Sequence, residues 1–338
     1  MRGMKAAFCP AKETVEVREV EAPAPGPGEV LVRVRACGIC GSDLHFYHGE
    51  LPSPPHISPG HEFSGEVAAL GEGVTGFETG QRVVVEPIRS CRTCAYCNTG
   101  RYHLCAKRAL LGTFAPGGLA ELVSVPAYTL YPLPDDLDFE LGALTEPLAV
   151  AVHGLHIARF APGERVLVLG CGTIGLLTVL AARAAGAGEV LATYRHEHQR
   201  EAALAMGAAR ALKDGGNERI EEPVDVVVET VGGAAPTLSQ ALGIVRAGGR
   251  ISVLGLFTQP AQINALGLML KEVLMVGGIT YCRPGEQSDF DVALGILRRY
   301  PEQARAIITH RFPLEEVSQA FAAAADKGSR SIKVQVAG

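Results

Sequence analysis

Apolar and polar residues alternate in short runs over roughly the first 148 residues. The segments EVLVRVRACG (29–38) and GQRVVVEP (80–87) are examples, and Gly/Pro clusters such as APAPGPGE separate these runs. A period of two places alternate side chains on one face of a strand, while Gly and Pro mark the turns between strands. This part of the chain is predicted to form a β-rich barrel-like or sandwich domain.

The pattern changes near residue 150. RVLVLG (165–170) is a short apolar run, and strand-like runs recur at 189–193, 224–229, 250–255 and 272–279, with Ala-rich helical stretches between most of them. Strands that alternate with helices indicate βαβ units and a parallel sheet. Beyond about residue 281 we expect a helix over 289–299, an amphipathic segment over 314–328 and a strand over 331–336. The fold class is therefore α/β, with a doubly wound parallel sheet.

Composition limits the classes of protein that are possible. A chain of 338 residues with 47% hydrophobic and 20% charged residues suits two globular domains. The net charge of −5 and the lack of a basic run disfavour binding to nucleic acid and to anionic membrane surfaces, which need positive charge. No run approaches the roughly 20 apolar residues of a membrane span, and no signal peptide is visible. We therefore expect a cytoplasmic location, where nine cysteines indicate metal ligands before disulfides.

A glycine motif follows the apolar run that ends at residue 170. Gly170, Gly172 and Gly175 fit G-x-G-x-x-G, and Thr173 and Ile174 complete the turn. The first glycine permits a tight turn, the second lets the backbone approach a pyrophosphate, and the third allows close helix-to-strand packing. The helix N-terminus offers free N–H groups to the phosphates. These five residues are predicted to bind a dinucleotide, and the alternative is a Gly-rich turn without a ligand.

The end of the second strand bears on which dinucleotide binds. A site for NAD usually has Asp or Glu there, to bond the ribose 2′-hydroxyl, but this chain has Tyr194 and Arg195. An arginine can hold a 2′-phosphate through a bidentate, charge-assisted pair. We therefore expect NADP(H) to be favoured over NAD(H), with Arg195, Arg200 and His196 as candidate contacts. The alternative is that these arginines are ordinary surface charges, and the nearby acid Glu197 favours this alternative.

Four cysteines lie within 15 residues of one another. They are Cys91, Cys94, Cys97 and Cys105. Four thiolates at this spacing suit a closed, tetrahedral structural zinc ion, although an iron–sulfur cluster takes the same ligands. The polar residues between them indicate a small lobe, over about 88–108, that a metal would hold together because burial could not.

A second set of metal-binding residue types is dispersed. Cys40 lies in CGICGSDLH, His61 and Glu62 in PGHEFSGEV, and Glu146 in LTEPLAV. Together they offer the mixed sulfur, nitrogen and oxygen ligands of a catalytic zinc that keeps one position open. Taken singly, each has an ordinary structural interpretation. Spacing alone does not show that they meet.

These segments resemble the zinc-containing medium-chain alcohol dehydrogenases, and especially the sorbitol (polyol) dehydrogenase branch. GICGSDLHFYHG, the four-cysteine lobe, GGLAELVSVP, LTEPLAVAVHGL and VLVLGCGTIG occur in the family's order over essentially the whole chain. The resemblance implies a GroES-like catalytic domain at 1–148 and 281–338. It also implies a Rossmann dinucleotide-binding domain at 149–280.

The same resemblance implies roles for the dispersed residues. Cys40 and His61 match catalytic zinc ligands, and Glu146 matches the third position, where liver-type enzymes have a cysteine. Glu62 matches a glutamate that either binds zinc directly or orients the site through water. Two zinc ions per chain follow, one catalytic and one structural.

Further matches concern the proton path and the cofactor. Ser42 matches the hydroxyl that takes the substrate's proton, and His45 matches the outer end of the relay. Cys37 is interpreted as a packed thiol. Tyr281 matches one half of an arginine–tyrosine pair of the polyol branch, whose arginine is replaced here by Thr280.

The predicted activity is hydride transfer between a secondary alcohol or polyol, sorbitol-like, and NAD(P). L-threonine or aldose dehydrogenase activity is an alternative within the family, and a non-catalytic NADPH-binding protein is an alternative of another class. The family implies a homo-oligomer, a tetramer or a dimer, joined through strands such as EVLMVGGI.

Overall fold

The computed structural model of the chain describes residues 3–51, 54, 56–216 and 220–338. The chain divides into two compact units. Unit 1 comprises Met1–Glu146, Leu297–Pro301 and Arg305–Gly338, and unit 2 comprises Pro147–Ile296 and Glu302–Ala304. Residues 281–296, which the sequence-based boundaries assign to the catalytic domain, fall within unit 2; the functional domain limits stay a prediction.

A seven-stranded sheet forms the centre of unit 1. Its order is β16-β17-β3-β4-β5-β9, and β8 pairs with β3. The strands are β3 (Glu29–Gly38), β4 (Glu62–Leu70), β5 (Arg82–Val85), β8 (Leu122–Pro126), β9 (Leu130–Pro132), β16 (Ile308–Pro313) and β17 (Lys333–Ala337). Along β3 most buried and partly exposed residues alternate, as the period-two pattern predicts, so one face packs into the core.

Smaller elements surround this sheet. β1 (Gly3–Ala11) and β2 (Thr14–Glu21) form an antiparallel pair, and α11 (Val317–Ala325) packs its buried face on the core of unit 1. The remaining elements are α1 (Gly41–Tyr47), β6 (Ile88–Arg89), α2 (Ala95–Asn98), η1 (Tyr102–Leu104), β7 (Ala109–Leu110), η2 (Ala127–Thr129), α3 (Phe139–Ala143), η3 (Leu314–Glu316) and η4 (Lys327–Ser329). The β-rich character predicted for this part of the chain is confirmed.

A six-stranded parallel sheet forms the centre of unit 2, in the order β12-β11-β10-β13-β14-β15. Its strands are β10 (Arg165–Leu169), β11 (Glu189–Tyr194), β12 (Arg210–Lys213), β13 (Val224–Glu229), β14 (Val245–Val253) and β15 (Leu274–Gly277). Central strands such as β10 and β13 are apolar along almost their whole length, because helices cover both faces of a parallel sheet. The sequence analysis did not identify β12, a four-residue edge strand with one buried residue.

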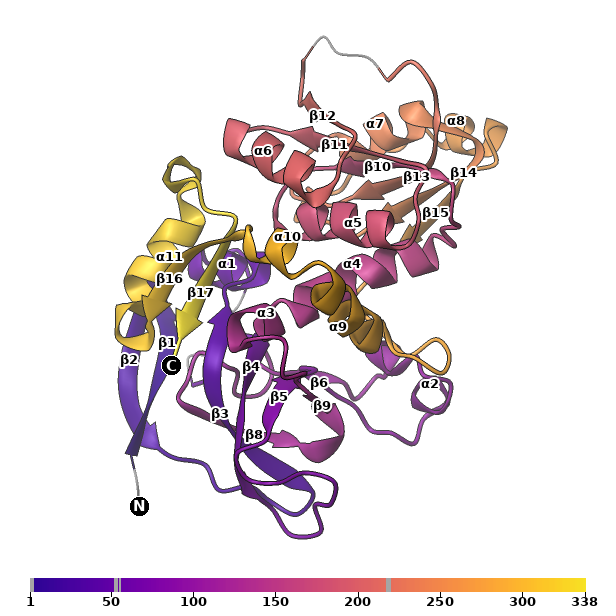
Figure 1. The fold of residues 1–338 in the computed structure, drawn as a ribbon. Helices are drawn as coiled ribbons and strands as arrows, with labels where there is room; N and C mark the ends of the chain where they lie inside the picture. Colours follow the sequence, from indigo (N-terminus) through magenta and orange to yellow (C-terminus); the bar gives the residue numbers. More distant parts are fainter. Residues whose placement is uncertain (1–2, 52–53, 55, 217–219) are drawn as a thin grey trace. The chain divides into compact units, whose positions relative to one another are not determined.

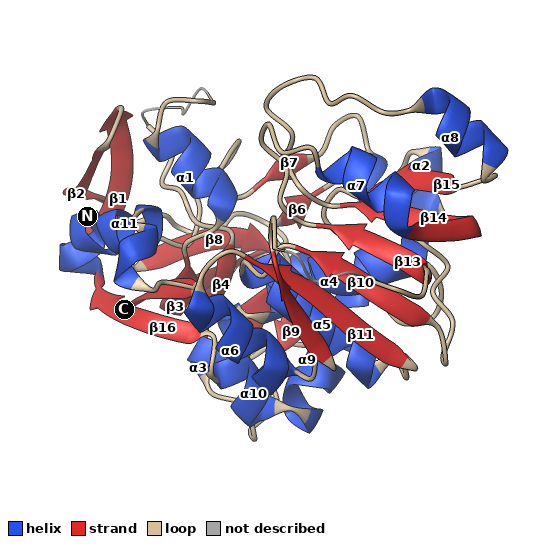
Figure 2. Cartoon of the chain, turned by 90° about the horizontal axis from the view of Figure 1, so that it is seen from above, coloured by secondary structure: helices blue, strands red, loops and turns tan. Residues whose placement is uncertain are grey.

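Helices lie on both faces of the parallel sheet. α5 (Thr173–Ala184) and α6 (Glu197–Met206) lie on one face, and α7 (Thr237–Ile244) and α8 (Ala265–Leu270) on the other (Figures 1 and 2). The chain also contains α4 (Thr145–Ile157), α9 (Asp289–Arg299) and α10 (Pro301–Arg305). The doubly wound sheet is therefore confirmed. Among the described residues, no helix combines the length and the apolar character that crossing a bilayer requires.

Candidate active site

The first group of candidate residues lies where β3 leads into α1. Cys40 precedes the helix with an extended backbone, at φ −90° and ψ 160°, so its thiol lies at the helix N-terminus. The buried carboxylate of Asp43 accepts a hydrogen bond from the backbone N–H of Cys40 at 2.8 Å. Asp43 is the third residue of the helix, and its bond to the residue before the helix fixes the orientation of Cys40.

The second group lies at the start of β4. β3 and β4 pair antiparallel with Gly38 opposite Glu62, so the end of one strand lies beside the start of the other. One ligand atom from each of Cys40, His61 and Glu62 lies within 4.8 Å of the others, and the last two residues are buried. Sulfur, nitrogen and oxygen donors in one cluster suit a zinc site with an open position. The structure therefore brings three of the four dispersed residues together.

A lysine that the sequence analysis did not single out holds the carboxylate of Glu62. The Nζ of Lys333, on β17, donates to the two carboxylate oxygens at 2.8 and 2.6 Å and to the backbone oxygen of Ile39 at 2.9 Å. All three N–H bonds of the ammonium are thus used. Gly38 leaves the space for this contact, because a Cβ there would lie 2.0 Å from Oε2 of Glu62. A metal bound by Glu62 would share an oxygen with Lys333.

Glu146 contributes charge to the same cluster. It is buried in the first turn of α4. Burial opposes protonation of His61, but negative charges, first that of Cys40 and also that of Glu146, hold the pKa of His61 well above its ordinary value. The charge of Glu146 therefore acts on the imidazole of His61. Three buried carboxylates and a thiol lie around one lysine and one histidine, and a divalent cation would offset the acidic groups that these two bases leave unpaired.

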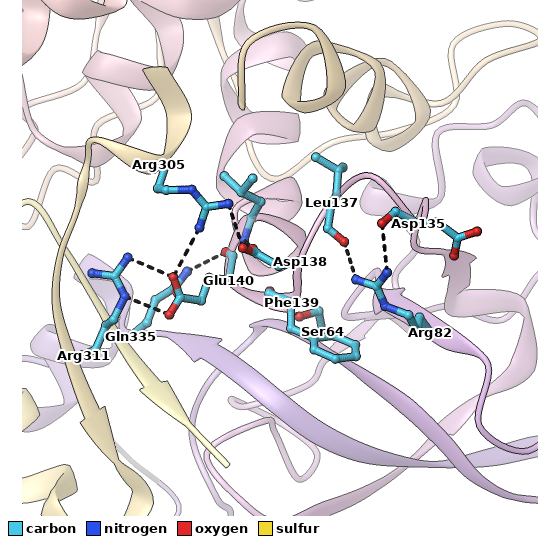
Figure 3. A network of polar contacts seen from close by, with 11 residues as sticks. Ser64, Arg82, Asp135, Leu137, Asp138, Phe139, Glu140, Arg305, Arg311 and Gln335 are labelled. Carbon is cyan, nitrogen blue, oxygen red and sulfur yellow. Dashed lines mark hydrogen bonds and ion pairs between the residues drawn. The ribbon is translucent and has the colours of Figure 1, made fainter. Parts of the chain in front are cut away.

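A polar network holds α3, the helix just before Glu146 (Figure 3). Arg311 donates to both carboxylate oxygens of Glu140 at 2.8 and 2.9 Å, and Arg305 lies 3.7 Å from the same carboxylate. The amide of Gln335 donates to the backbone oxygen of Glu140 at 2.9 Å. The network also includes Ser64, Arg82, Asp135, Leu137, Asp138 and Phe139. The C-terminal segment thus holds the helix whose end leads to Glu146.

The two residues predicted to move protons lie on α1. The hydroxyl oxygen of Ser42 lies 3.5 Å from Nε2 of His61, so it borders the cluster of metal-ligand types. His45 instead pairs with Glu50, and this hydrogen bond lowers the pKa of the Glu50 carboxyl. Within the part of the chain that the structure describes, no hydrogen bond joins Ser42 to His45. A relay between them needs a further group.

The four-cysteine lobe is compact. All four thiols lie within 4.8 Å of one another, and Sγ of Cys97 lies 3.5 Å from that of Cys94 and 3.8 Å from that of Cys91. None of the four is in a disulfide. The strands β6 and β7 pair antiparallel on either side of the lobe, so its two ends are held together. Four thiol donors in one small cluster fit a closed tetrahedral metal site.

The thiols of the lobe differ in acidity. Hydrogen bonds from the backbone and hydroxyl of Thr93 lower the pKa of Cys91 to about 5, with Thr93 Oγ1 3.6 Å from the sulfur. Burial raises the pKa of Cys97 to about 11. At neutral pH, Cys91 is therefore a thiolate before a metal arrives, whereas Cys97 must lose its proton as the metal binds.

The glycine motif forms the turn between β10 and α5. Gly170 has a φ of 96°, in the left-handed region that favours glycine. A Cβ on Gly175 would lie 1.8 Å from the backbone oxygen of Gly170, so only glycine allows this packing. Nothing lies within 4 Å of the Cβ position of Gly172, which leaves its backbone open to a ligand. Thr173 and Ile174 begin the helix. The turn has the shape that phosphate binding requires.

The residues after β11 are exposed and already paired. Tyr194 ends the strand, and the guanidinium of Arg195 lies 3.4 Å from the carboxylate of Asp214. Arg200 lies 2.8 Å from Glu197, on the same helix. A 2′-phosphate bound here would compete with these carboxylates for the two arginines. The carboxylates are weak competitors, because solvent screens exposed ion pairs.

Tyr281 has a different environment. Its side chain is completely buried, and its ring centroid lies 5.5 Å from that of Phe290. A completely buried ring offers no surface to a dinucleotide in this conformation. Its predicted contact with the cofactor stays a prediction.

The sequence analysis missed two residues that support the cluster. Asp43 stands three residues after Cys40, a spacing typical of capping residues, and this signal was available in CGSDLH. Lys333 was visible only as a charged residue in the strand-like run SIKVQV. A lysine in such a run is usually solvent-exposed, so the pattern alone does not predict its buried partner.

Two family models match the chain. Residues 26–135 match the alcohol dehydrogenase GroES-like domain, and residues 173–298 match the zinc-binding dehydrogenase model. These matches confirm the predicted fold class, a GroES-like domain with a Rossmann sheet.

Related proteins cover the chain almost completely. A sorbitol dehydrogenase of Halalkalibacterium halodurans is 35% identical over 330 residues, which is 94% of either chain. An L-threonine 3-dehydrogenase of Bacillus licheniformis is 35% identical over 305 residues, 87% of either chain. Among solved structures, one described as a zinc-binding dehydrogenase from Sinorhizobium meliloti 1021 bound to NADP has a TM-score of 0.90 and 33% identity, with all of both chains covered.

The mixed donor cluster and the doubly wound sheet define a metal- and nucleotide-dependent oxidoreductase. The chain belongs to the zinc-binding, medium-chain alcohol dehydrogenase family, in its sorbitol-like branch. It is an NAD(P)-linked alcohol or polyol dehydrogenase that uses zinc and a nicotinamide cofactor.

Proposed function

We propose that the chain oxidises a secondary alcohol or polyol, sorbitol-like in its vicinal hydroxyls, at the cluster of Cys40, His61 and Glu146. The observation that carries the proposal is the convergence of the Cys40 thiol, the His61 imidazole and the Glu62 carboxylate within 4.8 Å. The buried carboxylate of Glu146 adds its charge to this cluster. Such a set fits Zn²⁺ by the chemistry of its donors.

Cys40, His61 and Glu146 are proposed to hold the catalytic zinc. Because Lys333 occupies both oxygens of Glu62, we assign Glu62 to orientation of the site and Glu146 to the third ligand position. Bound zinc and nicotinamide supply, respectively, a Lewis acid that lowers the pKa of the alcohol and the acceptor of its hydride.

The remaining chemistry belongs to the chain. Ser42 accepts the alcohol proton at its hydroxyl oxygen while its own hydroxyl proton moves outward, and His45 is assigned to the outer end of this path, where a proton is released to solvent. A further group has to connect Ser42 to His45. The carboxylate of Asp43 lies 3.9 Å from Nδ1 of His61, beyond hydrogen-bond distance, so it acts on the imidazole through its charge. A closer approach of the two groups when a metal binds would add a hydrogen bond, which selects the tautomer of a ligating histidine.

Variants that lack one of the proposed zinc ligands test the mechanism. Cys40→Ser and His61→Ala should lower kcat at least a thousandfold, as expected when a metal that activates the substrate is lost. Cys37→Ser is the matched control, because this buried thiol lies three residues earlier outside the cluster and should leave kcat within about threefold. A Cys40→Ser enzyme that turns over normally with zinc only in the lobe would refute the mechanism.

The four-cysteine lobe is proposed to bind a second, structural zinc. Its four thiols meet within 4.8 Å without a histidine or carboxylate among them. Two zinc ions per chain are therefore expected by elemental analysis. An iron–sulfur cluster in the lobe would instead give iron and a visible absorbance.

NADP(H) is the proposed preferred cofactor. Support comes from Arg195 and Arg200 near the end of β11, where no acid follows Tyr194 directly, and from the similar structure bound to NADP. Arg195→Ala should reduce kcat/KM for NADPH at least tenfold and leave kcat/KM for NADH unchanged. A wild-type preference for NADH would overturn this assignment.

A direct comparison of candidate compounds is needed to identify the substrate. L-threonine is the second candidate, because a threonine dehydrogenase matches the chain at the same 35% identity as a sorbitol dehydrogenase. Polyols, butanediols, L-threonine and aldoses compared by kcat/KM would separate the two. The proposal for polyols fails if threonine is the better substrate by tenfold or more.

A homo-oligomer, a dimer or a tetramer, is also proposed. β15 is the edge strand of its sheet, and Leu266, Met269 and Leu270 on the neighbouring α8 are more than half exposed. An unpaired edge beside exposed apolar side chains is typical of a contact surface. Leu270→Asp should lower the mass found by sedimentation, whereas Leu204→Asp on α6 should not.

A cytoplasmic location is also proposed. All nine cysteines are free thiols, as is usual in a reducing compartment.

A further inference from the structure

A buried carboxylate ends the central strand β13 of unit 2. Glu229 is fully buried, and its Oε1 accepts three hydrogen bonds: from the backbone N–H of Val231 at 2.8 Å, from that of Gly232 at 2.9 Å, and from the hydroxyl of Thr237 at 2.8 Å. One oxygen therefore organises both the loop after β13 and the start of α7.

The second oxygen of Glu229 is enclosed by backbone. Oε2 is buried and makes no hydrogen bond within the described part of the chain. It lies where Gly255 has no side chain, since a Cβ there would be 2.4 Å from it and 2.4 Å from the nitrogen of Gly232. A buried charge with one oxygen unpaired is costly, so a stability role alone does not account for it.

The loop that Glu229 holds packs on the glycine turn. The hydroxyl of Thr230 donates to the backbone oxygens of Leu169 and Gly170 at 2.8 and 3.1 Å. A Cβ on Gly170 would lie 2.6 Å from Cγ2 of Val231, and one on Gly175 would lie 2.9 Å from Oγ1 of Thr230. Two of the three motif glycines therefore touch residues whose position depends on Glu229.

The location of this contact in the sheet is informative. β10 and β13 are neighbours, with Leu169 opposite Glu229, and the strand order runs outward in opposite directions from this pair. Doubly wound sheets bind ligands outside the carboxyl ends of their strands at this point. The loop after β13 and the glycine turn therefore form the two adjoining strand ends at the predicted dinucleotide site.

We propose that Glu229 is a positioning residue for the nicotinamide dinucleotide. Its charged Oε1 holds Thr230 and Val231 against the glycine turn, so that the turn presents its N–H groups to the pyrophosphate in one fixed conformation. This inference rests on the proposed binding of the cofactor by unit 2. It adds a residue outside the glycine motif on which the geometry of the motif depends.

The test compares cofactor affinity with stability in the zinc-loaded enzyme. Glu229→Gln keeps the shape but weakens three charge-assisted bonds, and should raise the Kd of NADPH, followed by its fluorescence, roughly tenfold. Glu229→Ala should raise it roughly a hundredfold. With saturating cofactor, kcat should change less than KM for NADPH, because the groups at the reacting atoms are unchanged.

Asp225 provides the matched control at the opposite end of the same strand. It accepts hydrogen bonds from the backbone N–H of Arg165 at 2.8 Å and from the guanidinium of Arg246 at 2.6 Å, so it is also a carboxylate that joins two segments. Asp225→Asn should lower Tm but leave the Kd of NADPH within twofold. Thr237→Val removes one of the three bonds to Glu229 and is the substitute if Glu229→Ala does not fold.

The outcomes separate two failures. If the Glu229→Gln and Thr237→Val enzymes bind NADPH as tightly as the wild type and lose only Tm, the inference is overturned and Glu229 is structural. If the wild-type chain itself binds neither NADPH nor NADH, the proposed function fails instead.

Discussion

The four-cysteine lobe and the cluster around Cys40 are two candidate metal sites of different construction. In the lobe, the four thiols come from 15 consecutive residues, and two short helical elements and one strand pair hold them. In the cluster, the candidate donors Cys40, His61 and Glu62 come from the end of β3 and the start of β4, and the proposed ligand Glu146 comes from the start of α4. Its support comes from β17, where Lys333 stands 271 positions after Glu62.

The difference has a physical consequence for each site. The lobe has few buried side chains, so its order would depend on the metal that its thiols are proposed to bind. His61, Glu62 and Lys333 of the cluster are buried in unit 1, and the polar groups of the cluster hold one another even before a metal is bound. We therefore expect the lobe to respond mainly to metal removal, and the cluster mainly to loss of a supporting charge.

The largest effect is expected for Lys333→Met. This change leaves the carboxylate of Glu62 buried without its partner, and should lower the free energy of unfolding by about 3–5 kcal/mol. Lys271→Met is the control, because Lys271 also uses its three N–H bonds, but on backbone oxygens of α7 and β14. Urea denaturation gives the free energy of unfolding of both variants. An equal loss of stability in the two would mean that the buried ion pair has no special role.

Cys97→Ser should have a smaller effect on stability and a clear effect on metal content. With one ligand lost, the lobe should release its zinc, lower the unfolding free energy by about 1–3 kcal/mol and leave one zinc per chain. Hydrogen exchange should increase over 91–105 and remain unchanged around Cys40. Loss of both zinc ions would show that the sites are not independent.

Thr93→Val should weaken zinc binding by the lobe in a pH-dependent way. Hydrogen bonds from Thr93 lower the pKa of Cys91 to about 5, so the wild-type thiolate is present above that pH. The variant loses the hydroxyl bond, its thiol pKa rises, and at pH 6 more protons compete with zinc. Affinity should fall roughly tenfold at pH 6 and hardly change at pH 9. A loss that is equal at both pH values would contradict this cause.

The smallest effect is expected for Arg311→Met, at the outer support of the cluster. Arg311 pairs with Glu140 at 2.8 Å, but both side chains are partly exposed, so the change should cost less than about 1 kcal/mol. The loss should shrink further in high salt. Arg298→Met removes the exposed pair with Asp136 away from α3 and is the control. A large loss of kcat in Arg311→Met alone would make the α3 network part of the catalytic site.

Local patterns in the sequence were enough for several features. The parallel sheet followed from apolar runs between helical stretches, since the side-chain period of each element is a local property. The glycine turn followed from three residues in six, and the lobe from four cysteines at short spacing. In the glycine turn and the lobe, the residues that act together are close in sequence and therefore close in space.

Tertiary structure alone decided how the distant residues meet. The antiparallel register of β3 and β4 places Glu62 beside Gly38, and β17 places Lys333 on the same carboxylate. The loop that Glu229 holds contacts the glycine turn only because β10 and β13 are neighbours. Strand order and register depend on the packing of the whole core, and a charged residue in a strand carries no local sign of its buried partner.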